Sequence, residues 1–389
     1  MRDRLKVNLE NIKQKGNYRA IRHVKPLDAS WILFNGKKFL NLCSNSYLSL
    51  HAHPQVIEAA AEAAHKYGAG TCSSRSISGS IELYRVLEDE IASYKCYPSG
   101  LVFSTGYMAN MGVIATLTEK DDVIFSDELN HSSLIDSTRL SRAKKVIYRH
   151  RDMNDLEGKI RKDRSKGIKF VVSESVFSMD GDIAPVADLV ELRNRYGYQL
   201  ILDDAHGTGV FGDTGRGGAE FFRLTGSMDV EMATFGKSFG SFGAFVLGDK
   251  IVTDYLVNRA RTFMYTTALS PSVLAASIAS IRLIKDNPSF RDDLWGNIEY
   301  IRRHMRDAGF DLKDSIGPIV PVVVGEDAKA VEMQHILMEK GVFIQAVRPP
   351  TVPPGTSRLR LTVVRSLTMD EMDFAINVLK YAGKKAGLI

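Results

Sequence analysis

The middle of the chain alternates short apolar runs with segments of helical periodicity, and this alternation constrains the fold more than any other feature of the sequence. Runs rich in β-branched and aromatic residues predict strands at 101–105, 123–127, 145–150, 169–175, 199–204 and 243–248. Helical patterns follow several of these runs, at 108–117, 153–163 and 188–197. Apolar strands joined by helices predict an α/β fold, with a mostly parallel sheet covered by helices on both faces.

The last third of the chain has a different pattern. Long helical patterns at 271–285 and 291–309 come first. Strand-like runs then follow at 319–325, 342–348 and 358–364, with further helical patterns at 328–340 and 369–386. Because 389 residues exceed what one compact core holds, we expect a large domain, 46–280, and a smaller α+β domain, 281–389. We expect the N-terminal segment, 1–45, to pack with the small domain, since chain termini often lie close together.

The composition argues against several classes of protein. A net charge of +5 is small for this length, and the basic residues of 142–169 alternate with acidic and apolar ones, which favours a solvated helical face over a nucleic-acid site. Three widely spaced cysteines without a CxxC pair argue against a zinc site and favour a reducing compartment. We find no signal peptide and no membrane span, so we expect a cytoplasmic protein without a resident metal.

Unusual polar residues directly follow the predicted strands, where ligands bind in open parallel sheets. Gly106 opens a helix, and the free N–H groups at such a helix start suit a phosphate. His131 follows the strand at 123–127 and opens another helix. Asp-Gly-Asp at 180–182 predicts a sharp turn after a third strand, and its acids lack the spacing of a calcium loop. These strand ends are therefore the first candidates for a ligand site.

The strand at 199–204 ends in two acids, Asp203 and Asp204, followed by His206. Adjacent acids at the end of an apolar strand are costly to bury without a cation, and either a ligand or the nearby Arg216 would supply one. Residues 207–212 also spell G-x-G-x-x-G. Further turn residues follow this motif where a dinucleotide fingerprint would open a helix, which argues against a NAD-dependent oxidoreductase.

Lys237 stands between glycines in an otherwise apolar stretch. Gly-Lys-Ser resembles the end of a P-loop, but that motif needs a glycine where this chain has Glu231, so the P-loop interpretation fails. Lys237 is then a phosphate ligand or a Schiff-base nucleophile, since desolvation makes a lysine reactive toward carbonyls. Pyridoxal 5'-phosphate would engage all of these strand ends, with an aldehyde for Lys237, a phosphate for Gly106 and a pyridine nitrogen for an acid.

Six segments of the chain resemble the α-oxoamine synthases, a family of fold-type I pyridoxal-phosphate enzymes. The segments are NLCSNSYLSL (41–50), STGYMANMGVI (104–114), DELNHSSLIDSTRLS (127–141), SESVFSMDGDIAP (173–185), LDDAHGTGVFGDTGRG (202–217) and TFGKSFG (234–240). An ordinary aminotransferase shares the lysine but not the NHSSLIDS and FSMDGD blocks together. The resemblance implies a large domain with a seven-stranded sheet, a smaller C-terminal domain, and a homodimer with active sites at the subunit interface.

The resemblance also implies roles for individual residues. Lys237 would bind the cofactor's aldehyde and act as the acid–base at the substrate Cα. Asp203 would contact the pyridine nitrogen. The preference for Asp203 over Asp204 comes only from the family's D-x-x-H pattern. His206, helped by Ser178, would bind the ring hydroxyl, and His131 would stack on the ring as a further catalytic residue. The phosphate would be held by Gly106, Tyr107 and Thr234, and by Thr267 of the other subunit.

The segment AVRPPTVPPGTSRLRLT (346–362) most resembles one branch of the family, the acyltransferases that join L-alanine to a pimeloyl thioester in biotin biosynthesis. The implied products are 8-amino-7-oxononanoate, carbon dioxide and the free thiol carrier, which is coenzyme A or acyl carrier protein. Arg360 would bind the alanine carboxylate. The rest of the substrate site would comprise Arg19, Asn45, His131 and Thr351.

The sequence departs from the family pattern at two places, and the second of them leaves other branches open. Tyr84 stands where the family has histidine, and Val363–Ser366 replaces small residues and a histidine next to the carboxylate-binding arginine. The members that acetylate glycine or palmitoylate serine therefore remain alternatives for the substrate preference, whereas the cofactor chemistry is unaffected.

Overall fold

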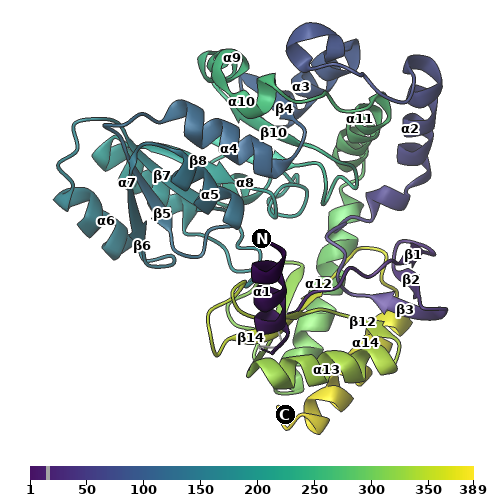
Figure 1. Cartoon of the computed structure of the whole chain (residues 1–389). Helices are drawn as coiled ribbons and strands as arrows, with labels where there is room; N and C mark the ends of the chain where they lie inside the picture. Colours follow the sequence, from purple (N-terminus) through teal and green to yellow (C-terminus); the bar gives the residue numbers. More distant parts are fainter. Residues whose placement is uncertain (15–17) are drawn as a thin grey trace.

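The computed structural model describes residues 1–14 and 18–389. Its centre is a seven-stranded sheet of order β4-β10-β9-β8-β7-β5-β6 (Figure 1). The strands are β4 (Ser99–Phe103), β5 (Val123–Asp127), β6 (Lys144–Tyr148), β7 (Lys169–Glu174), β8 (Gln199–Asp203), β9 (Val230–Thr234) and β10 (Ala244–Gly248). Only β10 runs antiparallel to its neighbours, β4 and β9, whereas all other neighbouring pairs are parallel. The predicted mostly parallel sheet is confirmed.

Six of the seven strands match apolar runs in the sequence, and β9 does not. Its sequence, VEMAT, carries Glu231 and lacks a β-branched run, so no period or composition marks it as a strand. Glu231 is nevertheless fully buried. The burial of this carboxylate is explained by an ion pair, because the ammonium of Lys95 lies against it.

Helices cover both faces of the sheet (Figure 1). One face packs against α4 (Gly106–Leu117), α5 (Ser132–Leu140), α9 (Lys250–Arg259) and α10 (Arg261–Met264). The other face packs against α3 (Glu82–Lys95), α6 (Met153–Lys162), α7 (Val186–Tyr196), α8 (Gly218–Phe221) and α11 (Pro271–Asp286), and α2 (Pro54–Tyr67) lies on α11. Side chains of a strand alternate between the faces, so Leu200 and Leu202 of β8 join the α3 side and Ile201 the α4 side.

Two smaller sheets complete the fold. The first has the order β11-β14-β13, formed by β11 (Ile319–Gly325), β14 (Ser357–Thr362) and β13 (Ala346–Val347). The second has the order β1-β2-β3-β12, formed by β1 (Lys25–Pro26), β2 (Trp31–Phe34), β3 (Lys37–Asn41) and β12 (Val342–Phe343). The single run expected at 342–348 is therefore two strands in two sheets. Because β3 pairs in parallel with β12, the first 41 residues contribute to a sheet with the C-terminal region.

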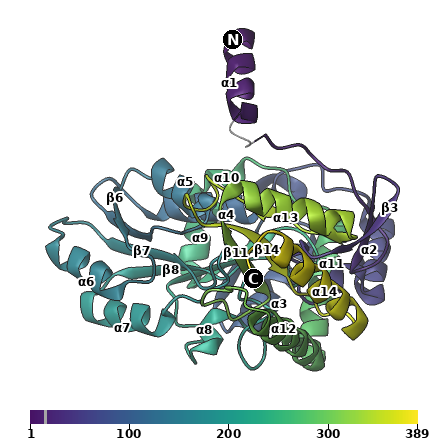
Figure 2. The ribbon, with the colours of Figure 1, turned by 90° about the horizontal axis from the view of Figure 1, so that it is seen from below.

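The remaining helices are α1 (Arg2–Gln14), α12 (Ser289–Asp307), α13 (Asp327–Glu339) and α14 (Met369–Lys385). α14 begins with a capping box, in which Thr368 accepts a hydrogen bond from the N–H of Glu371. α1, which the sequence did not predict, stands apart from the rest of the chain and buries none of its side chains (Figure 2). Within the described residues, no helix combines the length and the apolar character needed to cross a bilayer.

Candidate active site

A cavity of about 210 Å³ lies at the carboxyl ends of β5, β7, β8 and β9. It is lined by Gly106, Tyr107, Asn110, His131, Ser133, Glu174, Asp203, Ala205, His206, Met232, Thr234 and Lys237. Seven of the residues predicted from the sequence therefore meet here. Ser178 and Thr267 do not line this cavity.

Asp203 is the last residue of β8, and the pleat points it to the same face as Ile201, toward α4 and α5. Its Oδ2 accepts a hydrogen bond from Asn110 Nδ2 at 2.9 Å, and its Oδ1 accepts one from the N–H of Ala205 at 3.0 Å. Asn110 was not predicted, although it lies one turn after Gly106 in the quoted GYMAN stretch. A spacing of four places both residues on one side of α4, so this signal was present in the sequence.

Asp204 points to the opposite face and lines neither this cavity nor the larger one described below. It is fully buried and pairs with the ammonium of Lys95 at 2.8 Å, and Lys95 also pairs with Glu231. Arg216, the cation expected from the sequence, is not the partner, because its guanidinium donates to the backbone oxygen of Tyr94. The structure thus separates the two acids, with one in the cavity and one in a buried ion-pair network.

The glycines after Asp204 enclose its carboxylate. A Cβ at Gly207 would lie 2.0 Å from Asp204 Oδ1, and a Cβ at Gly217 would lie 1.8 Å from Asp204 Oδ2. The N–H of Gly218 donates to Oδ1 at 2.9 Å. Of the three glycines in the G-x-G-x-x-G spacing, Gly207 faces Asp204, whereas Gly209 and Gly212 face Ser238 and Glu220. Each glycine is thus packed against the protein's own side chains.

Lys237 follows β9 and extends into the cavity, where it is partly enclosed. Burial lowers the pKa of its ammonium to about 8, against the raising effects of Asp203 and Glu174, and the positive charge of Arg360 lowers it further. An amine with this pKa is protonated in most molecules at neutral pH, but its neutral fraction is far larger than that of an ordinary lysine. A neutral lysine is a nucleophile toward carbonyls and can also accept a proton.

His131 caps the N-terminus of α5, and its Nδ1 accepts a hydrogen bond from the N–H of Ser133. The backbone N–H of His131 donates a hydrogen bond to Glu174 Oε1 at 2.6 Å. Glu174 was missed in the sequence, although it lies at the end of the run that forms β7. Burial raises the pKa of its carboxyl well above the usual value, and the neighbouring charge of Asp203 raises it further.

His206 is buried at the cavity wall, and its Nδ1 lies 2.6 Å from the hydroxyl of Tyr47. Burial lowers the pKa of His206 well below its usual value, and the positive charge of Lys237 adds to this. The imidazole is therefore neutral near neutral pH. Tyr47 comes from the quoted NLCSNSYLSL segment, but no spacing in the sequence connects it to His206.

The start of α4 lines the cavity, and the free backbone N–H groups of a helix start suit an anion. Gly106 and Tyr107 are its first two residues, and the helix is capped by Thr105, whose side chain accepts from the N–H of Met108. The hydroxyl of Tyr107 donates a hydrogen bond to Asp136, which does not line the cavity. Thr234 also lines the cavity, and its Oγ1 accepts from the N–H of Gly236 at 3.1 Å.

Arg360 lies on β14 and is held by three contacts. Its Nε donates to the backbone oxygen of Ser178 at 2.7 Å, and one terminal nitrogen donates to Asn45 Oδ1 at 3.1 Å and to Thr362 Oγ1 at 3.0 Å. Arg360 and Asn45 are thus brought together, as expected, although neither lines the 210 Å³ cavity. Ser178 contributes its backbone oxygen to this arrangement.

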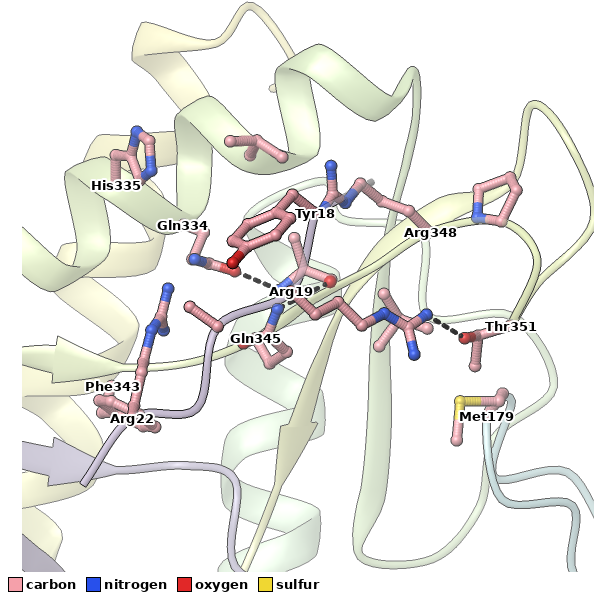
Figure 3. Close-up of a pocket in the computed structure, with 15 residues that line it drawn as sticks. Tyr18, Arg19, Arg22, Met179, Gln334, His335, Phe343, Gln345, Arg348 and Thr351 are labelled. Atoms are coloured by element: carbon pink, nitrogen blue, oxygen red, sulfur yellow. Dashed lines mark hydrogen bonds between the residues drawn. The ribbon is translucent and has the colours of Figure 1, made fainter. Parts of the chain in front are cut away.

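A second, larger cavity of about 630 Å³ lies between the N-terminal segment and the C-terminal sheet (Figure 3). Arg19 and Thr351 line it and are joined by a hydrogen bond of 3.1 Å. Arg22, Arg348 and His335 also line it, and its described lining contains no acidic side chain. A cavity with several cationic groups and apolar walls suits an elongated ligand that carries negative charge.

The two departures from the family pattern lie outside both cavities. The hydroxyl of Tyr84 accepts from the N–H of Leu269 at 2.6 Å, and the guanidinium of Arg75 lies 3.7 Å from its ring centre. Val363 and Val364 are buried. The side chains that follow them contact protein groups, namely Arg365 on the ring of Phe290 and Ser366 on Ser30 and Ser49. The backbone N–H of Arg365 also donates to the backbone oxygen of Tyr47 at 2.8 Å.

Thr267 also lies outside both cavities, in an isolated β-bridge with Ser74. Its backbone oxygen accepts a hydrogen bond from Ser104 Oγ at 3.4 Å. The expected contact of Thr267 with the cofactor of another subunit stays a prediction.

The chain matches known proteins over its whole length. Residues 37–379 match the family model described as aminotransferase class I and II. A protein from Lysinibacillus sphaericus named 8-amino-7-oxononanoate synthase is 42% identical over 389 residues, covering 100% of both chains. Another of that name from Citrifermentans bemidjiense is 44% identical over 384 residues, covering 98% of both chains.

Solved structures show the same similarity. A variant of serine palmitoyltransferase from S. paucimobilis with a bound PLP–myriocin aldimine superposes with a TM-score of 0.95 at 30% identity, covering 100% of this chain and 98% of that chain. An 8-amino-7-oxononanoate synthase from Francisella tularensis superposes with a TM-score of 0.77 at 28% identity, covering 89% of this chain and 98% of that chain.

Proposed function

The chain belongs to the class I and II aminotransferase family, and from this premise we propose that it is a pyridoxal-phosphate-dependent 8-amino-7-oxononanoate synthase of biotin biosynthesis. The enzyme joins L-alanine to a pimeloyl thioester and releases carbon dioxide and the free thiol carrier. One observation carries the proposal for the site, namely that Lys237, Asp203 and His206 line one cavity at the carboxyl ends of the sheet.

The cavity fits pyridoxal phosphate by the chemistry of its groups. Lys237 supplies an amine for the aldehyde, Asp203 a carboxylate for the pyridine nitrogen, and His206 a neutral imidazole for the ring hydroxyl. The start of α4, at Gly106 and Tyr107, supplies N–H groups and a positive dipole end for the phosphate. When bound, this cofactor acts as an electron sink that stabilises negative charge at the substrate Cα.

The chain's own residues then divide the remaining tasks. The neutral amine of Lys237 removes the proton from Cα of alanine and later returns one. Arg360 is held by Ser178, Asn45 and Thr362 through Nε and one terminal nitrogen, and it binds the alanine carboxylate through the other terminal nitrogen. His131 lines the cavity and is partly exposed, and its imidazole would cover the cofactor ring and polarise the thioester oxygen.

The acyl donor occupies the 630 Å³ cavity in this proposal, with Arg19 and Thr351 in contact with the pimeloyl chain (Figure 3). The cationic lining supports this placement, because both the free carboxylate of the pimeloyl chain and the phosphates of either carrier are negatively charged. The carrier is decided by experiment.

The test is a comparison of substrates with purified full-length protein and added pyridoxal phosphate. L-Alanine, glycine and L-serine are each combined with pimeloyl-CoA, pimeloyl acyl carrier protein, acetyl-CoA and palmitoyl-CoA, and products are identified by mass. We expect 8-amino-7-oxononanoate from L-alanine and a pimeloyl thioester, and no product with Lys237→Ala. Faster turnover of glycine with acetyl-CoA or of L-serine with palmitoyl-CoA would contradict the assignment.

We further propose a cytoplasmic homodimer, with domains at 46–280 and 281–389 and the segment 1–45 packed on the smaller one. Pairing of β3 with β12 supports the last point. The dimer is tested by sedimentation, and Thr267→Ala should weaken cofactor binding only if the active site lies at the subunit interface.

A further inference from the structure

Glu174 and Asp203 are direct neighbours in the central sheet. They are the last residues of β7 and β8, and the parallel ladder pairs one with the other. Adjacent strands lie about 4.8 Å apart, and paired residues point to the same face. Both side chains accordingly line the 210 Å³ cavity, together with Lys237. The cavity thus holds two carboxyl groups and one amine.

The two carboxyl groups have different partners. Asp203 accepts hydrogen bonds from two donors, Asn110 Nδ2 and the N–H of Ala205, and such bonds favour a charged carboxylate. Glu174 accepts one, from the N–H of His131 to Oε1. Among residues 1–14 and 18–389, Glu174 has no cation within ion-pair distance, although it is buried to 2% exposure. Two carboxyl groups this close do not both ionise without a large cost, so Glu174 is the one that stays protonated.

The other charges around this pair agree with that assignment. Asp204 and Glu231, the buried acids on the opposite face, share the ammonium of Lys95. Asp127, at the end of the neighbouring strand β5, is bonded to His150 Nδ1 at 2.9 Å. The remaining charged group that faces Glu174 is Lys237, which forms no ion pair with it. Among the described residues, Lys237 is therefore the cation nearest to Glu174 in the cavity, and it lies beyond ion-pair distance of this carboxyl group.

We propose that Glu174 works as a neutral carboxylic acid, and that its neutrality, by leaving Asp203 as the single anion of the cavity, allows Lys237 to lose its proton. The proton resides on Oε2, because Oε1 accepts the hydrogen bond from His131. Burial and the charge of Asp203 both raise the pKa of Glu174, which supports this protonation state. An ionised Glu174 would instead place a second negative charge beside Lys237 and hold it as an ammonium. Glu174 is thus a positioning residue that acts through Lys237 and His131.

The first test measures the proton itself, by infrared difference spectroscopy of the full-length holoenzyme at neutral pH. We expect the wild type to show a carbonyl stretch of a protonated carboxyl group that Glu174→Gln lacks. Glu231, whose pKa is also raised by burial, contributes equally to both spectra and cancels in the difference. Identical spectra in that region would overturn the proposal.

The second test measures Lys237 in the cofactor-free full chain, as the pH dependence of its labelling by an amine reagent, followed by peptide mass spectrometry. Under the proposal, Glu174→Gln removes no charge and keeps a side-chain oxygen that accepts from the backbone N–H of His131. The pH at which Lys237 is half-labelled should therefore be the same in this variant as in the wild type. Asp203→Asn is the positive control and should lower the midpoint, since Asp203 stabilises the ammonium. A Glu174→Gln midpoint lowered as far as that of Asp203→Asn would overturn the proposal.

The role of Lys237 as the base that removes the Cα proton rests on the proposed function, but neither the infrared measurement nor the labelling measurement requires turnover. If the substrate assays fail while the infrared band and the unchanged midpoint are observed, the proposed function fails alone. If product forms but the band is absent, only the inference about Glu174 fails.

Discussion

The hydroxyl of Tyr47 lies 2.6 Å from Nδ1 of His206 and connects the segment before α2 to the end of β8. Burial raises the pKa of Tyr47 to about 12 and lowers that of His206 well below its usual value, so both are neutral near neutral pH. The contact of Tyr47 with Asn45 is longer, at 3.5 Å, which indicates that the hydroxyl proton is donated to Nδ1. His206 then carries its proton on Nε2, as a donor to a ring hydroxyl requires.

Tyr47→Phe should weaken both folding and cofactor binding. The change leaves Nδ1 of buried His206 without its donor, so we expect the free energy of unfolding to fall by about 1–3 kcal/mol. Urea unfolding and a titration with pyridoxal phosphate measure the two effects. Tyr196→Phe is the matched control, because that hydroxyl contacts Glu157 outside both cavities. Equal losses in the two variants would contradict a special role for the Tyr47 contact.

Lys95→Met should be among the most destabilising single substitutions in the chain. It leaves Asp204 and Glu231 as buried carboxylates without a cation, and breaking such a network costs about 3–5 kcal/mol. Lys250→Met serves as the control, because the ion pair of Lys250 with Asp254 is exposed and is worth at most about 1 kcal/mol. Urea unfolding distinguishes the two, and a loss below 1 kcal/mol for Lys95→Met would show that the buried network is not ionised.

Stability should fall as the pH rises from about 6.5, the usual value for histidine, toward 9, because of His150. Burial lowers the pKa of His150, but hydrogen bonds to Asp127 and Asp182 outweigh this and raise it to about 9. A pKa raised in the folded state stabilises the protein below the unfolded-state value and loses that contribution as the pH passes the folded-state value. Because the ring is partly exposed, we expect a loss of about 1–2 kcal/mol.

Urea unfolding at several pH values measures this loss. His150→Gln, which does not titrate, should be less stable than the wild type at pH 6 and should show a flatter profile. If the profiles of the two proteins are parallel, the contacts of His150 with Asp127 and Asp182 do not carry the pH dependence.

Arg360 and Arg19 should affect different substrates. Arg360→Lys loses the planar fork that suits a carboxylate, so the KM for L-alanine should rise about tenfold or more with little change in the KM for the pimeloyl thioester. Arg19→Ala, in the larger cavity, should do the reverse. Steady-state kinetics with each substrate varied in turn measure both. If Arg19→Ala raises the KM for L-alanine instead, the larger cavity is not the acyl site.

Much of the site could be read from the sequence, because its main residues directly follow strands. Asp203, His206, His131 and Gly106 each lie within a few residues of a predicted strand, and parallel strands bring their carboxyl ends together. Lys237 follows β9, which was not predicted, and was identified instead by its position between glycines in an apolar stretch. The apolar runs also located six strands of the central sheet to within about two residues, the usual margin for element boundaries. The positions of apolar runs and of the polar residues that follow them were sufficient for these predictions.

The tertiary structure alone decided which groups meet across the fold. The pleat of β8 and its pairing with β7 place Asp203 beside Glu174 and turn Asp204 to the other face. The cation of Asp204 comes from Lys95, 109 positions away, and the donor to His206 from Tyr47, 159 positions away. Such contacts depend on strand order and helix packing, which no local pattern encodes. The sequence by itself determined which strand ends form the proposed cofactor site. Tertiary packing determined which charged and polar groups surround each titratable side chain in that site.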